Sequence, residues 1–286
     1  EPELFYPLRV RVCETCWLAQ TEDFAKREEF FTPDYAYFSS FSPAWLKHSE
    51  NYVHKMAKRF SLNTKSLVVE TASNDGYLLQ YVQALGIPCI GIEPTKSTAT
   101  AARAKGIKVI DDFFGVDTAK KMTDDGMYAD LMVANNVLAH VPDINDFVSG
   151  FTKLLKPQGI ATFEFPHLLK MVSEKQFDTV YHEHFSYLSL TSVSAVFLKN
   201  GLKVFDVEEL PTHGGSLRVF AQRLDGNHDT SPSVKAMLEV ESKAGLKTVD
   251  FYRKFQDGAN NMKDDLLLFL IKAKRSGKKV GAYGAA

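Results

Sequence analysis

The segment Tyr-His-Glu-His-Phe-Ser-Tyr-Leu-Ser at 181–189 gathers side chains that can move protons or bind a metal. His182 and His184 flank Glu183 in a chain that has 8 histidines. Imidazole and carboxylate groups act as general bases near neutral pH and also bind transition metals. The segment is therefore a metal site, a general base with a partner, or a polar cluster whose atoms satisfy one another in an aromatic core. A metal site needs at least one further ligand, which His213 or Glu183 could supply.

Short apolar segments alternate with helical ones through the middle of the chain. Strands are predicted at 66–71, 87–93, 107–110, 129–135 and 159–165. Such an alternation predicts an α/β fold, a parallel sheet with helices on both faces. In these sheets the ligand lies beyond the carboxyl ends of the strands, so the residues that follow each strand are the candidates for a binding site.

Other segments carry their own signals. A helix is predicted from Ser42, an N-cap residue that precedes a proline, and its His48 and His54 are expected at the surface or at the edge of the packed face. Two strands are predicted at 202–210 and 216–223, joined by the turn sequence Pro-Thr-His-Gly-Gly-Ser. One or two long helices are predicted within 231–277, and a buried strand is predicted to begin after them, within 278–286.

Polar and small residues follow four successive predicted strands. The candidate cofactor residues at these strand ends are Glu70, Ala72, Asn74, Asp75 and Gly76, then Glu93 and Pro94, then Asp112 and Phe113, then Asn135. A small-residue loop before a helix offers backbone N–H groups to an anion, and an acidic residue about 20 positions later is suited to a ribose diol. The loop lacks the G-x-G-x-x-G pattern of dinucleotide sites. S-adenosylmethionine therefore fits these positions better than NAD.

Composition and cysteine use narrow the function classes. The formal net charge of -1 gives no basic excess for nucleic acid or an anionic membrane, and no apolar run is long enough to span one. We therefore expect a cytoplasmic monomer with a small-molecule substrate. Cys13 and Cys16 form a C-x-x-C pair, half of a four-cysteine zinc site, with no second pair in the chain. A thioredoxin-like motif is disfavoured because neither a strand before the pair nor a helix after it is predicted.

Taken in order, these motifs resemble the sugar C-methyltransferase family. The motifs are E-x-small-x-N-D-G, G-I-E-P, D-F-F, N-N-V-x-A-H-V-P-D, Y-x-E-H and H-G-G, and the resemblance runs from about residue 10 to the end of the chain. It implies an S-adenosylmethionine-dependent enzyme that methylates nucleotide-linked keto-deoxysugars. It also implies a class I methyltransferase Rossmann-like domain at 41–230, a partial zinc-binding module at 1–40, and a helical linker with the start of a truncated Rossmann-like domain at 231–286. Ala72 departs from the glycine usual there, which puts cofactor affinity in doubt.

The same resemblance implies the catalytic residues, which are Tyr37, His140, Tyr181, Glu183 and His184. Removing a proton beside a ketone requires a general base, and the resulting enolate requires a hydrogen-bond donor. We assign His184 as the base, with Glu183 as its orienting partner or the alternate base, and the other three as substrate or enolate donors. His213 and Gly214 form a candidate substrate loop. Two alternatives stay open: an O- or N-methyltransferase on a small molecule, and a non-catalytic module that binds the cofactor or a nucleotide sugar.

Overall fold

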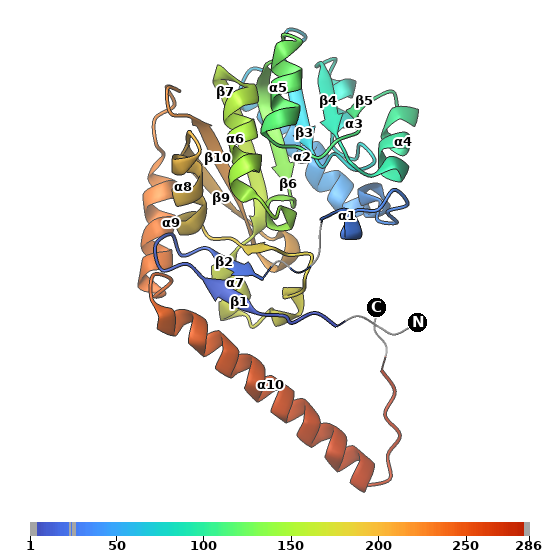
Figure 1. Cartoon of the computed structure of the whole chain (residues 1–286), viewed down its shortest axis with the longest axis vertical. Coiled ribbons are helices and arrows are strands. Elements are labelled where there is room, and N and C mark those ends of the chain that lie inside the picture. Colours follow the sequence, from blue (N-terminus) through green and yellow to red (C-terminus); the bar gives the residue numbers. More distant parts are fainter. Residues whose placement is uncertain (1–4, 23, 25–26, 283–286) are drawn as a thin grey trace.

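The predicted strands assemble into a seven-stranded sheet in a computed structural model that describes residues 5–22, 24 and 27–282 (Figure 1). The strand order is β5-β4-β3-β6-β7-β10-β9. The bounds are β3 (Val68–Thr71), β4 (Cys89–Ile92), β5 (Lys108–Ile110), β6 (Ala129–Asn135), β7 (Leu155–Pro166), β9 (Leu202–Leu210) and β10 (Ser216–Arg223). The ladders from β5 through β7 are parallel, whereas β10 runs antiparallel to both β7 and β9.

Helices cover both faces of this sheet. One face packs against α2 (Pro43–Arg59), α3 (Leu79–Ala84) and α4 (Lys96–Ala104). The other packs against α5 (Val116–Asp124), α6 (Ile144–Leu154), α8 (Leu190–Lys199) and α9 (Pro232–Lys243). Helix α2 begins as predicted, because the Ser42 hydroxyl accepts the backbone N–H of Trp45 and Pro43 fills the first position. The predicted three-layer α/β architecture is confirmed.

A small antiparallel sheet connects the amino-terminal segment to the histidine-rich motif. It consists of β1 (Val10–Val12), β2 (Ala19–Thr21) and β8 (Ser186–Tyr187). The Thr21 hydroxyl donates to the backbone carbonyl of His184 at 3.0 Å, and the Thr21 N–H donates to that of Phe185 at 3.1 Å. The first strands of the chain therefore hold the end of the motif in place.

The remaining helices are α1 (Arg27–Phe30), α7 (Leu168–Ser173) and α10 (Val249–Arg275), with single-turn helices η1 (Ser39–Phe41), η2 (Leu138–His140), η3 (Phe177–Thr179) and η4 (Thr212–Gly214). The long helix α10 extends away from the other elements (Figure 1). The prediction of one or two helices within 231–277 is confirmed by α9 and α10. None of the described residues is part of a helix with the length and apolar character needed to cross a membrane.

The strand predicted after α10 is wrong for the part of it that the structure describes. Residues 278–282 have no regular secondary structure, and Val280 is 52% exposed. An apolar segment becomes a buried strand only where another strand pairs with it, and none of the described strands does so. Residues 283–286 of the prediction lie outside the described residues.

Candidate active site

A cavity of about 400 Å³ opens at the carboxyl ends of β3, β4 and β6, the edge of the sheet where a ligand was expected. Most of the predicted site residues line it: Tyr37, Ala72, Asn74, Glu93, Pro94, Phe113, Asn135, His140, Tyr181, Glu183 and His213. Residues of the predicted set that do not line it are Glu70, Asp75, Gly76, Asp112, His184 and Gly214. Residues that follow different strands and are far apart in the sequence therefore line one cavity, as predicted.

At one end of the cavity, the Glu93 carboxylate holds the loop that follows β3. Its Oε2 accepts the backbone N–H of Asn74 at 2.8 Å, and its Oε1 accepts that of Thr95 at 2.9 Å and the Thr95 hydroxyl. Glu93 is 4% exposed. A carboxylate has about four lone-pair positions, so Oε2 retains acceptor capacity for a ligand hydroxyl. This placement agrees with the predicted contact to a ribose.

Asn135 gives the clearest sign that the cavity binds a ligand. Its side chain is buried and lines the cavity, yet neither its amide nitrogen nor its amide oxygen makes a well-formed hydrogen bond among the described residues, and the Tyr77 hydroxyl is its polar neighbour. Buried amides are nearly always paired in folded proteins. Phe113 and Phe114 line the same cavity, which gives it an apolar wall beside this polar group. The residues present therefore fit S-adenosylmethionine, which combines hydrogen-bonding groups with a flat aromatic ring.

Three predicted cofactor residues do not line the cavity and instead stabilise the loop that follows β3. Glu70 is fully buried, and burial raises its pKa well above the ordinary range, with Glu93 and Asp75 adding to the rise. The Asp75 carboxylate pairs with Lys105 at 3.3 Å. Gly76 adopts φ 76°, and a Cβ there would lie 2.3 Å from Cδ1 of Ile107, so only glycine fits the turn.

Asp112 does not face the cavity. Its carboxylate accepts the Thr118 hydroxyl at 3.1 Å and pairs with Lys121 at 3.1 Å, which ties the β5–α5 connection to the first turns of α5. Asp112, a predicted cofactor residue, is therefore bound to the helix that follows it and does not face the cavity. The neighbouring Phe113 does line the cavity, as predicted.

Strained backbone concentrates around the cavity. Ala72, Asn74, Asn136 and His213 have φ of 51°, 49°, 52° and 51°, in the left-handed region, and all four line it. For residues other than glycine this conformation costs on the order of 1 kcal/mol or more and persists where function requires it. The glycine expected at position 72 would adopt this conformation without a steric penalty.

At the other end of the cavity, Tyr181 stands in front of His184. The Tyr181 hydroxyl lies 3.0 Å from Nε2 of His184, and Nδ1 of His184 lies 2.8 Å from the backbone carbonyl of Thr179. A carbonyl only accepts, so Nδ1 carries the proton and Nε2 accepts from Tyr181. Burial, together with the nearby His140, lowers the pKa of His184 to about 4, so this imidazole is neutral at neutral pH.

Glu183 pairs with His140, not with His184 as expected. Its Oε1 lies 3.3 Å from Nδ1 of His140, and both side chains line the cavity. This contact with His140 is the main cause that lowers the pKa of Glu183, and burial opposes it. An imidazole whose Nδ1 faces a carboxylate has Nε2 left to accept a proton, the arrangement that serves a general base.

The metal interpretation of the histidine motif is not supported. His182 does not line the cavity, and its Nε2 lies 3.2 Å from the backbone carbonyl of Pro7. In the described part of the chain, no group of three or more His, Cys, Asp or Glu side chains is arranged to hold a metal ion.

Cys13 and Cys16 lie between β1 and β2. Among the described residues they form a single cysteine pair, with no third side chain of these types arranged to share a metal ion with them. A strand does precede that pair, contrary to expectation, but it belongs to an antiparallel hairpin, and the element that comes next after the pair is strand β2.

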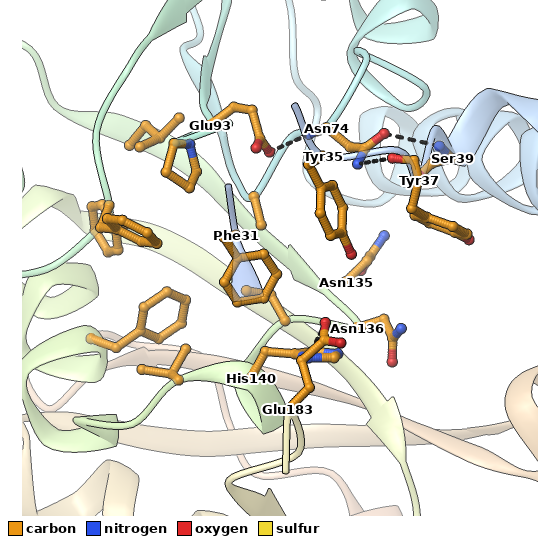
Figure 2. A pocket seen from close by; sticks show the side chains of 18 of the residues that line it. Phe31, Tyr35, Tyr37, Ser39, Asn74, Glu93, Asn135, Asn136, His140 and Glu183 are labelled. Atoms are coloured by element: carbon orange, nitrogen blue, oxygen red, sulfur yellow. Dashed lines mark hydrogen bonds and ion pairs between the residues drawn. The ribbon is translucent and has the colours of Figure 1, made fainter. Parts of the chain in front are cut away.

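An aromatic segment forms one wall of the cavity, and of its residues only Tyr37 was predicted from the sequence. Phe31, Tyr35 and Tyr37 line it, and in Figure 2 Phe31 and Tyr35 are seen between Glu93 and His140. The density of aromatic residues at 30–41 is a signal for such a wall.

The Asn74 amide fastens this aromatic segment to the cofactor loop. Its Oδ1 accepts the Ser39 N–H at 2.9 Å, and its Nδ2 donates to the Tyr37 carbonyl at 3.0 Å (Figure 2). Both ends of the amide are therefore occupied by the protein itself. Asn74 lines the cavity, but its polar atoms serve to hold the wall in place.

The predicted substrate loop is a tight turn, η4, at the rim. His213 lines the cavity, whereas Gly214 does not. The Gly214 carbonyl accepts the Gln176 side-chain N–H at 2.9 Å, and a Cβ on Gly214 would lie 2.5 Å from that nitrogen. Gly214 therefore permits the turn that places His213.

Comparison with known proteins identifies relatives along the whole chain. A family model described as a methyltransferase domain matches residues 45–207, one described as a C-methyltransferase C-terminal domain matches 211–286, and one described as zinc binding matches 1–31. The C-methyltransferase NovU of Streptomyces niveus is 32% identical over 283 residues, which are 99% of this chain and 67% of NovU.

Two solved structures show the fold alone. The PH0226 protein from Pyrococcus horikoshii OT3 has a TM-score of 0.54 at 14% identity, over 70% of this chain and 99% of that one. An S-adenosylmethionine-dependent methyltransferase from Clostridium acetobutylicum ATCC 824 has a TM-score of 0.50 at 10% identity, over 64% of this chain and 92% of that one. The class I methyltransferase fold expected from the sequence is confirmed.

Proposed function

The chain belongs to the C-methyltransferase family and is an S-adenosylmethionine-dependent enzyme, and we propose that it methylates the carbon beside the ketone of a nucleotide-linked deoxysugar. The observation that carries the proposal is a single cavity with two chemically different ends. Glu93 lies at one end and Tyr181 and the His140–Glu183 pair lie at the other, and the Asn135 amide also lines the cavity (Figure 2).

For the proton transfer we propose the His140–Glu183 pair as the general base, in place of His184. His184 does not line the cavity, both of its ring nitrogens are already hydrogen-bonded, and a pKa of about 4 makes it a weak base. His140 lines the cavity and has one ring nitrogen facing Glu183. The carboxylate orients the ring and stabilises the imidazolium that forms when Nε2 takes the proton.

Loss of this proton leaves an enolate, whose oxygen needs a hydrogen-bond donor. Tyr181 is the proposed donor, because its hydroxyl lies at the cavity and is held there by His184. Tyr37 and His213 are the proposed contacts to the sugar. S-adenosylmethionine, when bound, supplies the methyl group that the substrate carbon takes up. Phe31 and Tyr35 shield the reacting atoms from water.

Calorimetry combined with isotope exchange tests the proposal. Titration with S-adenosylmethionine should release heat, with NAD as the negative control. In D₂O with a keto-deoxysugar nucleotide and S-adenosylhomocysteine, the hydrogen beside the ketone should exchange without methyl transfer. Cofactor binding without exchange or turnover on any keto-sugar would favour a non-catalytic binding module. Turnover on a hydroxyl or amine acceptor would favour an O- or N-methyltransferase.

Zinc and the domain division remain proposals as well. We propose that Cys13 and Cys16 are two ligands of a structural zinc, supported by the zinc-binding family match to residues 1–31. Metal analysis of the purified protein tests it, because the double substitution of both cysteines by serine should remove the bound zinc. We also propose that the chain divides into three units, at residues 1–40, 41–230 and 231–286. Helix α9, at the start of the third unit, packs on strand β9 of the second.

A further inference from the structure

A buried charge pair lies behind the cavity, on the face of the sheet that α2 covers. Glu164 on β7 and Arg218 on β10 are directly opposite in the antiparallel ladder, and their side chains are 1% and 4% exposed. Nη2 of Arg218 lies 2.6 Å from Oε2 of Glu164. His48, expected at the surface or at the edge of its helix, is part of this cluster, because its Nε2 lies 2.9 Å from the same oxygen.

The two oxygens of Glu164 hold two different parts of the cavity wall. Its Oε1 accepts the Thr212 hydroxyl at 2.9 Å, and Thr212 directly precedes the strained His213. Its Oε2 binds His48, whose ring stacks on Trp45 with centroids 5.0 Å apart.

Trp45 connects His48 to His213. The Trp45 and His213 rings meet edge to face at 5.2 Å, and both side chains line the cavity. The carboxylate therefore reaches His213 by two routes, through the backbone of the η4 turn and through the stacked rings of His48 and Trp45.

Stability alone does not explain such a pair. Burying two charges costs most of what their attraction returns, so apolar side chains of similar size usually stabilise a fold equally well. Burial by itself would raise the pKa of Glu164, but the hydrogen bond from His48 and the charge of Arg218 lower it, so the carboxylate is ionised at neutral pH. Arg218 also approaches Glu208, whose Oε2 lies 3.7 Å from its Nη1.

We propose that Glu164 is a positioning residue that holds His213 and Trp45 in the geometry that binds the sugar. The proposal rests on the proposed function, in which His213 contacts the substrate. Glu164 does not line the cavity, so it acts through Thr212 and His48.

The test removes the link between Glu164 and the turn and leaves the charge pair intact. Thr212→Val deletes the hydroxyl at nearly constant volume, and Thr212→Ser restores it. We expect Thr212→Val to raise KM for the keto-sugar by about tenfold, the usual effect of losing a hydrogen bond to a charged group, with kcat and cofactor affinity nearly unchanged. Thr212→Ser should return KM to the wild-type value. Glu164→Gln should raise KM at least as much, but it is secondary because it also disturbs Arg218.

Thr191→Val is the matched control. The Thr191 hydroxyl also donates to a buried carboxylate, that of Glu241 at 2.6 Å, and Thr191 does not line the cavity. A KM unchanged by Thr212→Val, or raised equally by Thr191→Val, would overturn the proposal.

An activity-free measurement separates this proposal from the proposed function. The imidazole NMR signals of His213, assigned by their loss in His213→Asn, should shift in Thr212→Val and not in Thr191→Val. If they shift while the wild-type protein binds no cofactor and turns over no keto-sugar, the positioning by Glu164 stands and the proposed function fails. If they do not shift, the positioning proposal fails whatever the activity.

Discussion

The Tyr181 hydroxyl lies 3.0 Å from Nε2 of His184, and of the two side chains the tyrosine is the one that lines the cavity. His184 donates from Nδ1 to the carbonyl of Thr179 at 2.8 Å, which leaves Nε2 to accept from Tyr181. The histidine therefore orients the phenol, and the phenol contacts whatever occupies the cavity.

Tyr181→Phe should lower kcat by about 10² to 10³, the effect of removing one donor to a developing oxyanion. Cofactor affinity measured by calorimetry should not change, because Tyr181 lies at the end of the cavity opposite Glu93. His182→Gln is the control from the same motif, since His182 contacts the backbone of Pro7 and does not line the cavity. Wild-type methyl transfer by Tyr181→Phe would exclude it as the donor.

The two candidate bases can be separated by hydrogen exchange beside the substrate ketone. His140→Gln should slow this exchange by about 10² to 10⁴, the usual contribution of a general base. His184→Gln should keep a measurable rate, because the His140–Glu183 pair remains in place. NMR in D₂O follows both variants. The reverse outcome would return the role of base to His184, the residue expected from the sequence.

The neutral state of His184 makes the stability of the fold depend on pH. Its folded pKa, about 4, is below the ordinary histidine value, so the unfolded chain binds the proton more tightly. The stabilising contribution is therefore complete above about pH 6.5 and is lost as pH falls toward 4, by roughly 3 kcal/mol in total. Urea unfolding across this range should show a smaller loss in His184→Gln than in wild type. Exposed His54→Gln is the control, and an equal loss in His184→Gln would contradict the assignment.

The strand ends were predictable because parallel strands bring their carboxyl ends to one edge of a sheet. Ala72, Glu93 and Asn135 follow three different strands and line one cavity, although they are far apart in the sequence. Periodicity and turn residues located each strand, and the position of a residue after its strand was enough to place it.

Partners across elements were not predictable in the same way. His140 and Glu183 meet through the docking of η2 against the motif at 181–189, and no local pattern encodes that contact. His48 looked like a surface or edge residue because its helix is mostly polar around it, yet Glu164 and Arg218 on neighbouring strands draw it inward. Burial of charged residues depends on which elements pack together, and a single sequence does not reveal that.

The backbone at Ala72 predicts an unusual substitution effect. At φ 51°, Ala72→Gly should raise the free energy of unfolding by about 1 kcal/mol, because relief of left-handed strain exceeds the added entropy of the unfolded chain. Cofactor affinity should rise or stay the same, since the loop keeps its shape.

Ala101→Gly, inside helix α4, is the matched control and should lower stability by about 1 kcal/mol. Denaturant unfolding measures both variants. Destabilisation by Ala72→Gly as well would mean that the Ala72 methyl group makes favourable contacts that outweigh its strain.

Glu241 on α9 fixes the start of α8 and should be a major determinant of stability. Its carboxylate is fully buried, pairs with His167 at 2.7 Å, and accepts the backbone N–H groups of Leu190 and Thr191 at 2.7 and 2.8 Å. A lost hydrogen bond to a buried charged acceptor costs about 1.5 to 3 kcal/mol, so Glu241→Gln should destabilise the fold by at least about 2 kcal/mol at pH 7.

The pH dependence of this effect follows from the direction of the pKa shift. Burial alone would raise the pKa of Glu241, but the hydrogen bonds from His167 and Thr191 lower it. The contribution of the Glu241 carboxylate to the free energy of unfolding is therefore present above the ordinary glutamate pKa. It is lost as the pH falls through the lower pKa of the folded state. Wild type and Glu241→Gln should converge in stability in acid, as measured by urea unfolding. Glu239→Gln, an exposed neighbour on the same helix, should change stability by less than about 0.5 kcal/mol. A difference between wild type and Glu241→Gln that stays constant into acid would show that shape, and not charge, is what Glu241 contributes.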